Sequence, residues 1–344
     1  MGGAEVFTRE VASRLVGFGH QVTLFTAEFP GCRSEEFSEG VRIVRSGGRF
    51  SVYRQARKHY EKRFSKENYD LIIDEINTRP FFVPKFVRDN SRVVALIHQL
   101  ARQYWFYETP FPVNYIGYYV LENRWLMNYV CVPTITVSES TKLDLLALGF
   151  KSVHIVPEGL NFKPLNQLSE KSDFPVIAYS GRLKRAKRPD HAIKAFIEVK
   201  KRLPDAELWV MGKGDFEDDL KRISPDGVKF LRDLDDAKRR ELTGKAWVLV
   251  NPSAREGFGL NVIEANAVGT PCVGYDVPGL RDSIMNQKTG LLARAGHIED
   301  LATKIVTLLE NENLRLGLSK DALEYSRQFS WERCAEQFLQ SAIA

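Results

Sequence analysis

Short apolar runs alternate with helical patterns along almost all of the 344 residues, and this alternation constrains the fold more than any other feature. The runs are continuously apolar, as is typical of parallel strands that are buried on both faces. Between them lie helical patterns such as 189–202. Alternating strands and helices predict doubly wound parallel α/β sheets. The predicted strands are 21–26, 71–73, 93–97, 135–137, 153–156, 176–179, 208–211, 247–250 and 271–274.

A polar stretch without periodicity, 163–173, lies near the middle of the chain and predicts a linker. The length suits two domains of about 150 residues each. We therefore predict a first Rossmann-like domain over 1–165 and a second over 174–328. The amphipathic end, 329–344, predicts a helix that returns toward the first domain. Open α/β sheets bind ligands beyond the carboxyl ends of their strands, so the residues that follow the strands are the candidates for a site.

The start of the chain predicts an incomplete first sheet. Gly2-Gly3-Ala4-Glu5 resembles the turn and helix start that follow a first strand, yet no strand-like run precedes it. Phe7, Val11 and Leu15 then form the apolar stripe of a helix. We expect the central strand of the first sheet to be missing.

Composition and charge exclude several classes of protein. The chain is 44% hydrophobic and 27% charged, typical of a soluble globular protein, and no apolar run approaches the ~20 residues of a membrane span. The first residues lack a secretory signal, and the four scattered cysteines favour reduced thiols in the cytoplasm. The net charge of +5 comes without any nucleic-acid-binding module, so we expect no nucleic acid partner.

One predicted helix concentrates basic residues. It is either a solvated face or a peripheral contact with anionic headgroups at the inner face of the cytoplasmic membrane. Its basic residues are Arg54, Arg57, Lys58, Lys62, Arg63 and Lys66.

The segment 255–265 carries the strongest chemical signal. Gly257 and Gly259 let the backbone approach a ligand, and the free N–H groups at the start of the following helix favour a phosphate. Glu256 precedes the helix and Glu264 lies one turn inside it, so the two carboxylates can accept hydrogen bonds from the hydroxyls of a sugar and of a ribose. The alternative is a surface charge at Glu256 and a helix-dipole residue at Glu264.

A second anion site is predicted at 181–189, which follows a strand and precedes a helix that begins at Pro189. Arg182 offers a planar fork and Lys187 a point charge, a sensible pair for a diphosphate. The alternative is a solvated loop. Gly212 follows the next strand, in a weaker Gly-x-Gly signal, and we expect no metal at Asp233 and Asp235 despite their spacing.

His98 ends a strand of the first domain, and such strand ends are expected to face a cleft between the two domains. His98 is therefore a candidate site residue, although a lone histidine is more often structural. Downstream lies a concentration of aromatic residues that suits core packing, an acceptor-binding surface or a membrane-facing surface. Its members are Tyr104, Trp105, Phe106, Tyr107, Phe111, Tyr115, Tyr118 and Tyr119.

Taken together, these segments resemble the family 4 retaining glycosyltransferases of the GT-B fold. The matching text is Gly-Gly-Ala-Glu at 2–5, Thr-Val-Ser-Glu-Ser at 136–140, Gly-Arg-Leu…Lys-Arg-Pro-Asp at 181–190 and Glu-Gly-Phe-Gly-Leu…Glu-Ala at 256–265. Phe-Ser-Trp-Glu at 329–332 resembles the start of the family's returning helix. The chain departs from the family at Glu158 and Asn161, where Asn and Asp are usual.

The resemblance implies two Rossmann-like domains and a metal-independent transfer of a hexose-type sugar, without a cofactor, from a UDP- or GDP-linked donor to a glycan or lipid-linked acceptor. Arg182 and Lys187 would hold the diphosphate, Glu256 the sugar and Glu264 the ribose. His98 would lie near the reacting sugar. The other donor-binding positions would be Gly3, Gly212, Gly257, Phe258, Gly259 and Leu260.

Two alternatives remain open at this point. A nucleotide-sugar epimerase can use the same fold, although the Glu-x7-Glu segment argues against it. A degenerate nucleotide-sugar-binding subunit, inactive for want of the first strand, is the alternative outside enzymes.

Overall fold

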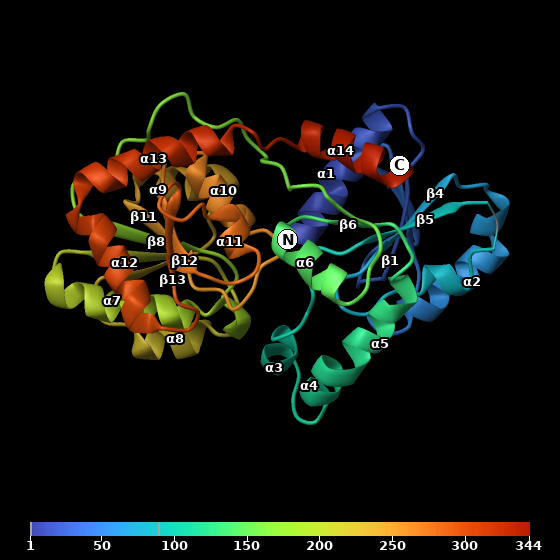
Figure 1. The fold of residues 1–344 in the computed structure, drawn as a ribbon, viewed down its shortest axis with the longest axis horizontal. Helices are drawn as coiled ribbons and strands as arrows, with labels where there is room; N and C mark the ends of the chain where they lie inside the picture. Colours follow the sequence, from blue (N-terminus) through green and yellow to red (C-terminus); the bar gives the residue numbers. More distant parts are fainter. Residues whose placement is uncertain (1, 89) are drawn as a thin grey trace. The chain divides into compact units, whose positions relative to one another are not determined.

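The computed structural model describes residues 2–88 and 90–344, and contacts within the chain divide it into two compact α/β units (Figure 1). Unit 1 contains the described residues up to Arg102, then Phe111–Gly159 and Trp331–Ala344. Unit 2 contains Gln103–Pro110 and Leu160–Ser330. Met1, with which the predicted first domain begins, lies outside the described residues.

The sheet of unit 2 has six strands, all parallel to their neighbours, in the order β10-β9-β8-β11-β12-β13. The order reverses between β8 and β11, which makes that place the switch point of a Rossmann-like sheet. The strands are β8 (Val176–Ser180), β9 (Glu207–Met211), β10 (Val228–Leu231), β11 (Val248–Asn251), β12 (Cys272–Tyr275) and β13 (Gly290–Ala293).

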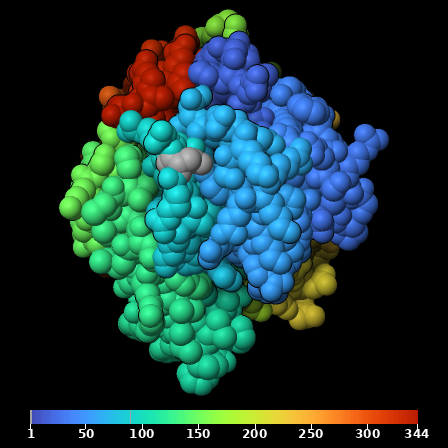
Figure 2. Space-filling model, turned by 90° about the vertical axis from the view of Figure 1, so that its right-hand side faces the viewer, coloured from blue at the N-terminus to red at the C-terminus, as the bar shows by residue number. Residues whose placement is uncertain are grey.

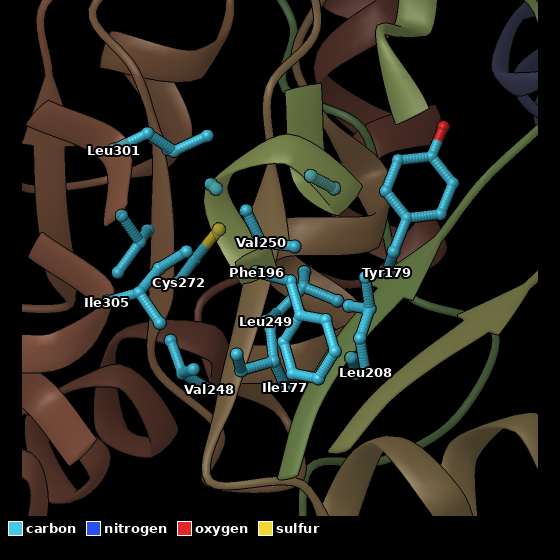
Figure 3. Packing of buried hydrophobic residues seen from close by; sticks show 14 of the residues in the cluster. Ile177, Tyr179, Phe196, Leu208, Val248, Leu249, Val250, Cys272, Leu301 and Ile305 are labelled. Atoms are coloured by element: carbon cyan, nitrogen blue, oxygen red, sulfur yellow. The ribbon is translucent and has the colours of Figure 1, made fainter. Parts of the chain in front are cut away.

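Helices cover both faces of this sheet (Figure 1). One face carries α7 (Pro189–Arg202), α8 (Glu217–Ile223) and α12 (Ile298–Glu310). The other carries α9 (Asp236–Lys245), α10 (Leu260–Asn266) and α13 (Glu312–Ser326), while α11 (Leu280–Ser283) follows β12. Figure 3 shows Phe196 of α7 packed among side chains of the strands, with Leu301 and Ile305 of α12 in the same cluster. Burying each such side chain contributes about 1.5–3 kcal/mol, which holds the strand ends in place.

Unit 1 has two sheets instead of one. The first has the order β1-β3-β2, with β2 antiparallel to β3, and the second is parallel with the order β4-β5-β6-β7. Among the described residues α1 (Gly3–Gly17) comes first, and β1 and β4 each pair on one side only. The described residues contain no strand before α1. The strands are β1 (Thr23–Thr26), β2 (Glu35–Ser38), β3 (Val41–Arg45), β4 (Leu71–Glu75), β5 (Arg92–Leu96), β6 (Thr134–Thr136) and β7 (Val153–Ile155).

The C-terminal helix α14 (Trp331–Ile343) packs along α1, and Figure 2 shows their red and blue surfaces side by side. The ring of Phe7 meets those of Trp331 and Phe338 edge to face, each at 5.9 Å between centroids. The remaining helices of unit 1 are α2 (Val52–Lys62), η1 (Phe64–Lys66), η2 (Val83–Lys85), α4 (Val113–Ile116), η3 (Gly117–Leu121), α5 (Glu122–Leu126), η4 (Met127–Tyr129) and α6 (Glu139–Ala147).

Two parts of the chain differ from the predicted domain plan. Residues 103–110, which contain α3 (Tyr104–Glu108), belong to unit 2, although the predicted first domain included them. The predicted linker is fixed to unit 2 by Lys171, whose Nζ donates to the carbonyl oxygens of Gly244 and Ala246, each at 2.9 Å. It also donates to Thr270 Oγ1 at 2.8 Å. The segment 163–173 therefore packs on unit 2 and is part of it.

Candidate donor site

Two loops leave the sheet of unit 2 at its switch point, one after β8 and one after β11. The backbone N–H of Ala254 donates to the carbonyl of Ala186 at 3.0 Å, which joins the loops directly. Asn261 reinforces the junction, because its Nδ2 donates to the Ser180 carbonyl at 2.7 Å and its Oδ1 accepts from Asn251 Nδ2 at 3.0 Å. Ligands of open α/β sheets bind in the crevice formed at this place.

An ion pair between Lys187 and Glu256 connects the same two loops. Lys187 Nζ lies 2.5 Å from Glu256 Oε2, and Ser253 Oγ donates to the other carboxylate oxygen at 2.7 Å. Only 17% of the Lys187 side chain and 13% of the Glu256 side chain are exposed. Burial lowers the pKa of Lys187, but Glu256 and Tyr104 raise it by more, so the ammonium group stays charged.

Arg182 precedes Lys187 in the loop after β8, and α10 follows Glu256. The Arg182 side chain is exposed, and its carbonyl is fixed by the Tyr179 hydroxyl at 3.2 Å. Gly259 has φ +93° and precedes Leu260, the first residue of α10, while Glu264 lies half-buried one turn further on. Because α10 has only seven residues, its dipole is short.

Two other predicted donor-binding residues have structural roles. A Cβ at Gly212 would lie 1.9 Å from the carbonyl oxygen of Gly181, so this glycine lets the loop after β9 pack on the loop after β8. The ring of Phe258 is buried against that of Phe329, at 5.5 Å between centroids. Gly257, between Glu256 and Phe258, is half-buried.

The helix α3 contributes residues that the sequence did not indicate. The Tyr104 hydroxyl donates to the carbonyl of Arg255 at 3.1 Å and also bonds Lys187. The Tyr107 hydroxyl accepts from Arg188 Nη2 at 2.6 Å. These tyrosines belonged to the aromatic concentration for which core packing, an acceptor-binding surface and a membrane-facing surface were all open. Tyr107 lies 81 residues from Arg188 and Tyr104 lies 151 residues from Arg255, so no spacing pattern could connect them.

The predicted residues Gly3 and His98 belong to unit 1. Gly3 opens α1, and His98 follows β5 and is buried. The ring of His98 has a carboxylate at each nitrogen, with Glu75 Oε1 3.7 Å from Nε2 and Glu158 Oε1 3.5 Å from Nδ1. Sequence reasoning singled out Glu158 only as a departure from a family pattern.

Asp233 and Asp235 each contact a residue of their own unit. Asp233 pairs with Lys213, and Asp235 caps α9 by accepting from the N–H of Lys238 at 2.7 Å. In the part of the chain that the structure describes, no three His, Cys, Asp or Glu side chains gather as a metal site requires.

Comparison with known proteins extends this picture. A family model described as Glycosyltransferase Family 4 matches residues 1–163, and one described as Glycosyl transferases group 1 matches residues 163–325. A D-inositol 3-phosphate glycosyltransferase of Corynebacterium aurimucosum is 33% identical over 173 residues, which are 47% of this chain and 41% of that protein. A poly(glycerol-phosphate) alpha-glucosyltransferase of Bacillus subtilis is 33% identical over 53% of this chain and 27% of its own length. The chain thus spans less than half of either relative.

Solved structures share the fold over almost the whole chain. The sucrose-phosphate synthase of Thermosynechococcus elongatus matches with a TM-score of 0.78 and 23% identity, over 98% of this chain and 92% of that one. Alr3699/HepE of Anabaena matches with a TM-score of 0.71 and 16% identity, over 98% of this chain and 95% of that one. At these identities the likeness concerns the fold, which is GT-B. With a family model matching each half of the chain and this fold throughout, the protein belongs to the family 4, group 1 glycosyltransferases.

Proposed function

We propose that this protein is a retaining glycosyltransferase that moves a hexose-type sugar from a nucleotide-diphosphate sugar to a glycan or lipid-linked acceptor. The observation that carries the proposal is the part-buried pair of Lys187 and Glu256 at the switch point of unit 2, with the exposed Arg182 in the same loop as Lys187. A cation, a carboxylate and a second cation are what a diphosphate linked to a polyhydroxylated sugar requires.

Donor binding would divide the ion pair between two parts of the ligand. Lys187 would turn to phosphate oxygens, and Glu256 would accept hydrogen bonds from sugar hydroxyls. As the bond from the sugar carbon to the phosphate oxygen breaks, negative charge grows on the leaving diphosphate. Fixed cations therefore stabilise the transition state more than the ground state.

Retention needs no protein nucleophile in this scheme. The acceptor hydroxyl attacks the sugar carbon from the face that the diphosphate leaves, and its proton passes to a phosphate oxygen. One C–O bond forms as another breaks, and the cations carry the charge that a metal ion carries in other transferases. Glu264 would hold the ribose, and the backbone of Gly257, Gly259 and Leu260 would add donors to the phosphates.

The names of structural neighbours support the donor class. Alr3699/HepE was solved in complex with UDP-glucose, and TarM of S. aureus was solved in complex with UDP. For this chain the same class of donor is a proposal, with UDP- and GDP-linked hexoses as the candidates.

The donor assignment predicts a strong effect of two single substitutions. Glu256→Gln and Lys187→Met should each lower the transfer rate by on the order of 100-fold, the usual cost of removing one preorganised charge-stabilising group. The measurement incubates purified protein with UDP- and GDP-hexoses and detects free nucleotide diphosphate and glycosylated products by mass. Lys245→Met, which removes an exposed lysine paired with Glu241, is the control and should retain full activity.

Other outcomes of this screen would replace the proposal. An epimerised nucleotide sugar without transfer would indicate an epimerase, and donor binding without turnover would indicate a binding subunit. Near-normal transfer by either variant would contradict the donor site.

The contacts of Tyr104 predict that its hydroxyl positions Lys187 for sugar transfer. Tyr104→Phe removes only the hydroxyl that bonds Lys187 and the carbonyl of Arg255. A hydrogen bond to a charged group contributes about 1.5–3 kcal/mol, so kcat/KM for the donor should fall roughly 10- to 100-fold. Tyr107→Phe, which changes a contact with Arg188 instead, is the matched control and should have the smaller effect. Equal kinetics for wild type and Tyr104→Phe would show that this hydroxyl positions nothing.

The proposal also predicts that transfer does not depend on a divalent cation. Since Asp233 and Asp235 are engaged with Lys213 and Lys238, excess EDTA should change the initial rate less than twofold. If EDTA abolished transfer and Mg²⁺ or Mn²⁺ restored it, the metal-independent scheme would be wrong.

We propose further that α2 brings the protein to anionic membranes in which a lipid-linked acceptor would lie. No helix in the described residues is long and apolar enough to cross a membrane. Arg57 pairs with Glu61, and Arg63 pairs with Glu35 and Glu67. The exposed Arg54, Lys58 and Lys62 of α2 stand outside these ion pairs. The uncharged segment between α3 and α5 adds exposed rings of Phe111, Tyr115 and Tyr119.

The membrane proposal predicts a result that depends on these three residues. Each basic residue at an anionic surface contributes about 1 kcal/mol, so Arg54→Gln, Lys58→Gln and Lys62→Gln together should weaken binding more than tenfold. Co-sedimentation with vesicles of phosphatidylglycerol and phosphatidylcholine measures this. A triple variant of the carboxylate-paired lysines Lys201, Lys221 and Lys245 is the control. Equal sedimentation of both variants and wild type would remove the membrane contact.

A further inference from the structure

We propose that Glu75 and Glu158 hold His98 as a permanently charged imidazolium through the neutral pH range, and that Glu158 is thereby a positioning residue for sugar transfer. The statement about charge stands on the structure of unit 1 by itself. The statement about transfer rests on the proposed function.

Three elements of unit 1 assemble the cluster. His98 follows β5, Glu75 ends β4, and Glu158 follows β7, so all three lie at the carboxyl edge of one parallel sheet. Glu75 Oε1 is 3.7 Å from Nε2 of His98, and Glu158 Oε1 is 3.5 Å from Nδ1. The His98 and Glu158 side chains are 7% and 6% exposed, and that of Glu75 is 23% exposed.

The two carboxylates decide the protonation of the ring. A neutral imidazole has one N–H donor and one bare nitrogen that can only accept a hydrogen bond. A carboxylate also only accepts, so whichever nitrogen were bare would present its lone pair to a negative charge. With a carboxylate on each side, only the doubly protonated ring presents an N–H to both. At 3.5 and 3.7 Å these contacts are longer than hydrogen bonds, and the preference is one of charge. In a buried site this electrostatic preference is stronger than it is in water.

The other groups around His98 do not oppose this charge. Phe7 of α1 meets its ring edge to face, at 4.9 Å between centroids, and the Thr141 hydroxyl donates to its backbone carbonyl at 3.3 Å. The Cys334 thiol of α14 lies near Glu158, and burial together with Glu158 raises the pKa of that thiol, which therefore stays neutral. Thr8 donates to the second oxygen of Glu75 at 2.7 Å, which keeps that carboxylate oriented.

The balance of these effects favours the cation. Burial lowers the pKa of His98, but its interactions with Glu158 and Glu75 raise it to about 9. The pKa in the folded protein thus exceeds the ordinary value of 6.5. The stabilisation from this cluster is fully present below pH 6.5 and is lost as the pH rises through about 9.

A charged His98 has a different role in transfer from a neutral one. An imidazolium cannot remove a proton from an acceptor hydroxyl, which excludes His98 as a general base at neutral pH. Both of its ring nitrogens are buried and face the two carboxylates, so His98 acts through Glu75, the more exposed of the two, which can accept from a sugar hydroxyl. The cluster therefore suits the recognition of a sugar hydroxyl by Glu75, with the charge of His98 kept by Glu158. Asparagine, which the family usually has at position 158, would supply no such charge.

The test is an NMR titration of the full-length protein labelled at the histidine side chains. The chain has six histidines, and His98→Asn identifies the resonance of this one. In wild type the His98 resonance should not titrate until the pH approaches 9, and in Glu158→Gln and Glu158→Asn its pKa should fall toward or below 6.5. Glu75→Gln should act in the same direction. Glu217→Gln, which removes a buried carboxylate paired with Lys221 and Arg232 in unit 2, is the control and should leave the titration unchanged.

Transfer kinetics give a second and separable readout. In Glu158→Gln, kcat should acquire a new decline as the pH rises through the lowered pKa of His98, a decline that wild type lacks between pH 6 and about 8. Two results would overturn the proposal. One is a wild-type His98 that titrates near pH 6.5, and the other is a raised pKa of His98 that stays unchanged in Glu158→Gln and in Glu75→Gln. If no donor or acceptor gives transfer, the proposed function fails, whereas the titration still decides the charge of His98.

Discussion

The ion pair of Lys187 and Glu256 depends on the reversal of strand order between β8 and β11, and the other candidate donor contacts are arranged around that reversal. From β8 and from β11 the chain continues toward opposite edges of the sheet, so the helices leave the ends of these two strands uncovered. The loops after the two strands occupy this place and are tied to each other through Ala186, Ala254 and Asn261. A lysine from one loop then meets a glutamate from the other at 2.5 Å. Ligand binding at this place can replace the ion pair within the protein by two contacts between protein and ligand, so that neither charge is left without a partner.

The two units treat buried cations in similar ways. In unit 2 a carboxylate and a tyrosine hydroxyl keep Lys187 charged although burial opposes the charge. In unit 1 two carboxylates do the same for His98. Both clusters lie at the carboxyl ends of parallel strands, where side chains from several elements converge and water is partly excluded. The common design is a cation whose charge does not depend on the ligand.

Patterns within one segment were predictable, and contacts between distant segments were not. Continuous apolar runs predicted β8, β9, β11 and β12, because strands buried on both faces leave that signature. The helix α7 has the predicted bounds 189–202, and α14 (331–343) lies within the predicted 329–344. The strands β2 and β3 carry charged residues among apolar ones, and β13 begins with glycine, so none of them stood out. Among the candidate site residues, Lys187 and Glu256 could be proposed from loops next to strands. Tyr104 could not, because its helix has five residues and its partners lie in another part of the sequence.

The edge strands β1 and β4 of unit 1 can each pair with a further strand. An unpaired strand edge offers a row of N–H and C=O groups to any extended segment, and proteins usually protect such edges with charge, proline or a covering element. The two sheets of unit 1 have edge strands at β1 and β2 and at β4 and β7, and Ile73 of β4 is 36% exposed, whereas β8, β11 and β12 of unit 2 are buried throughout. The free edges of β1 and β4 are therefore places in unit 1 where an added extended segment could continue a sheet.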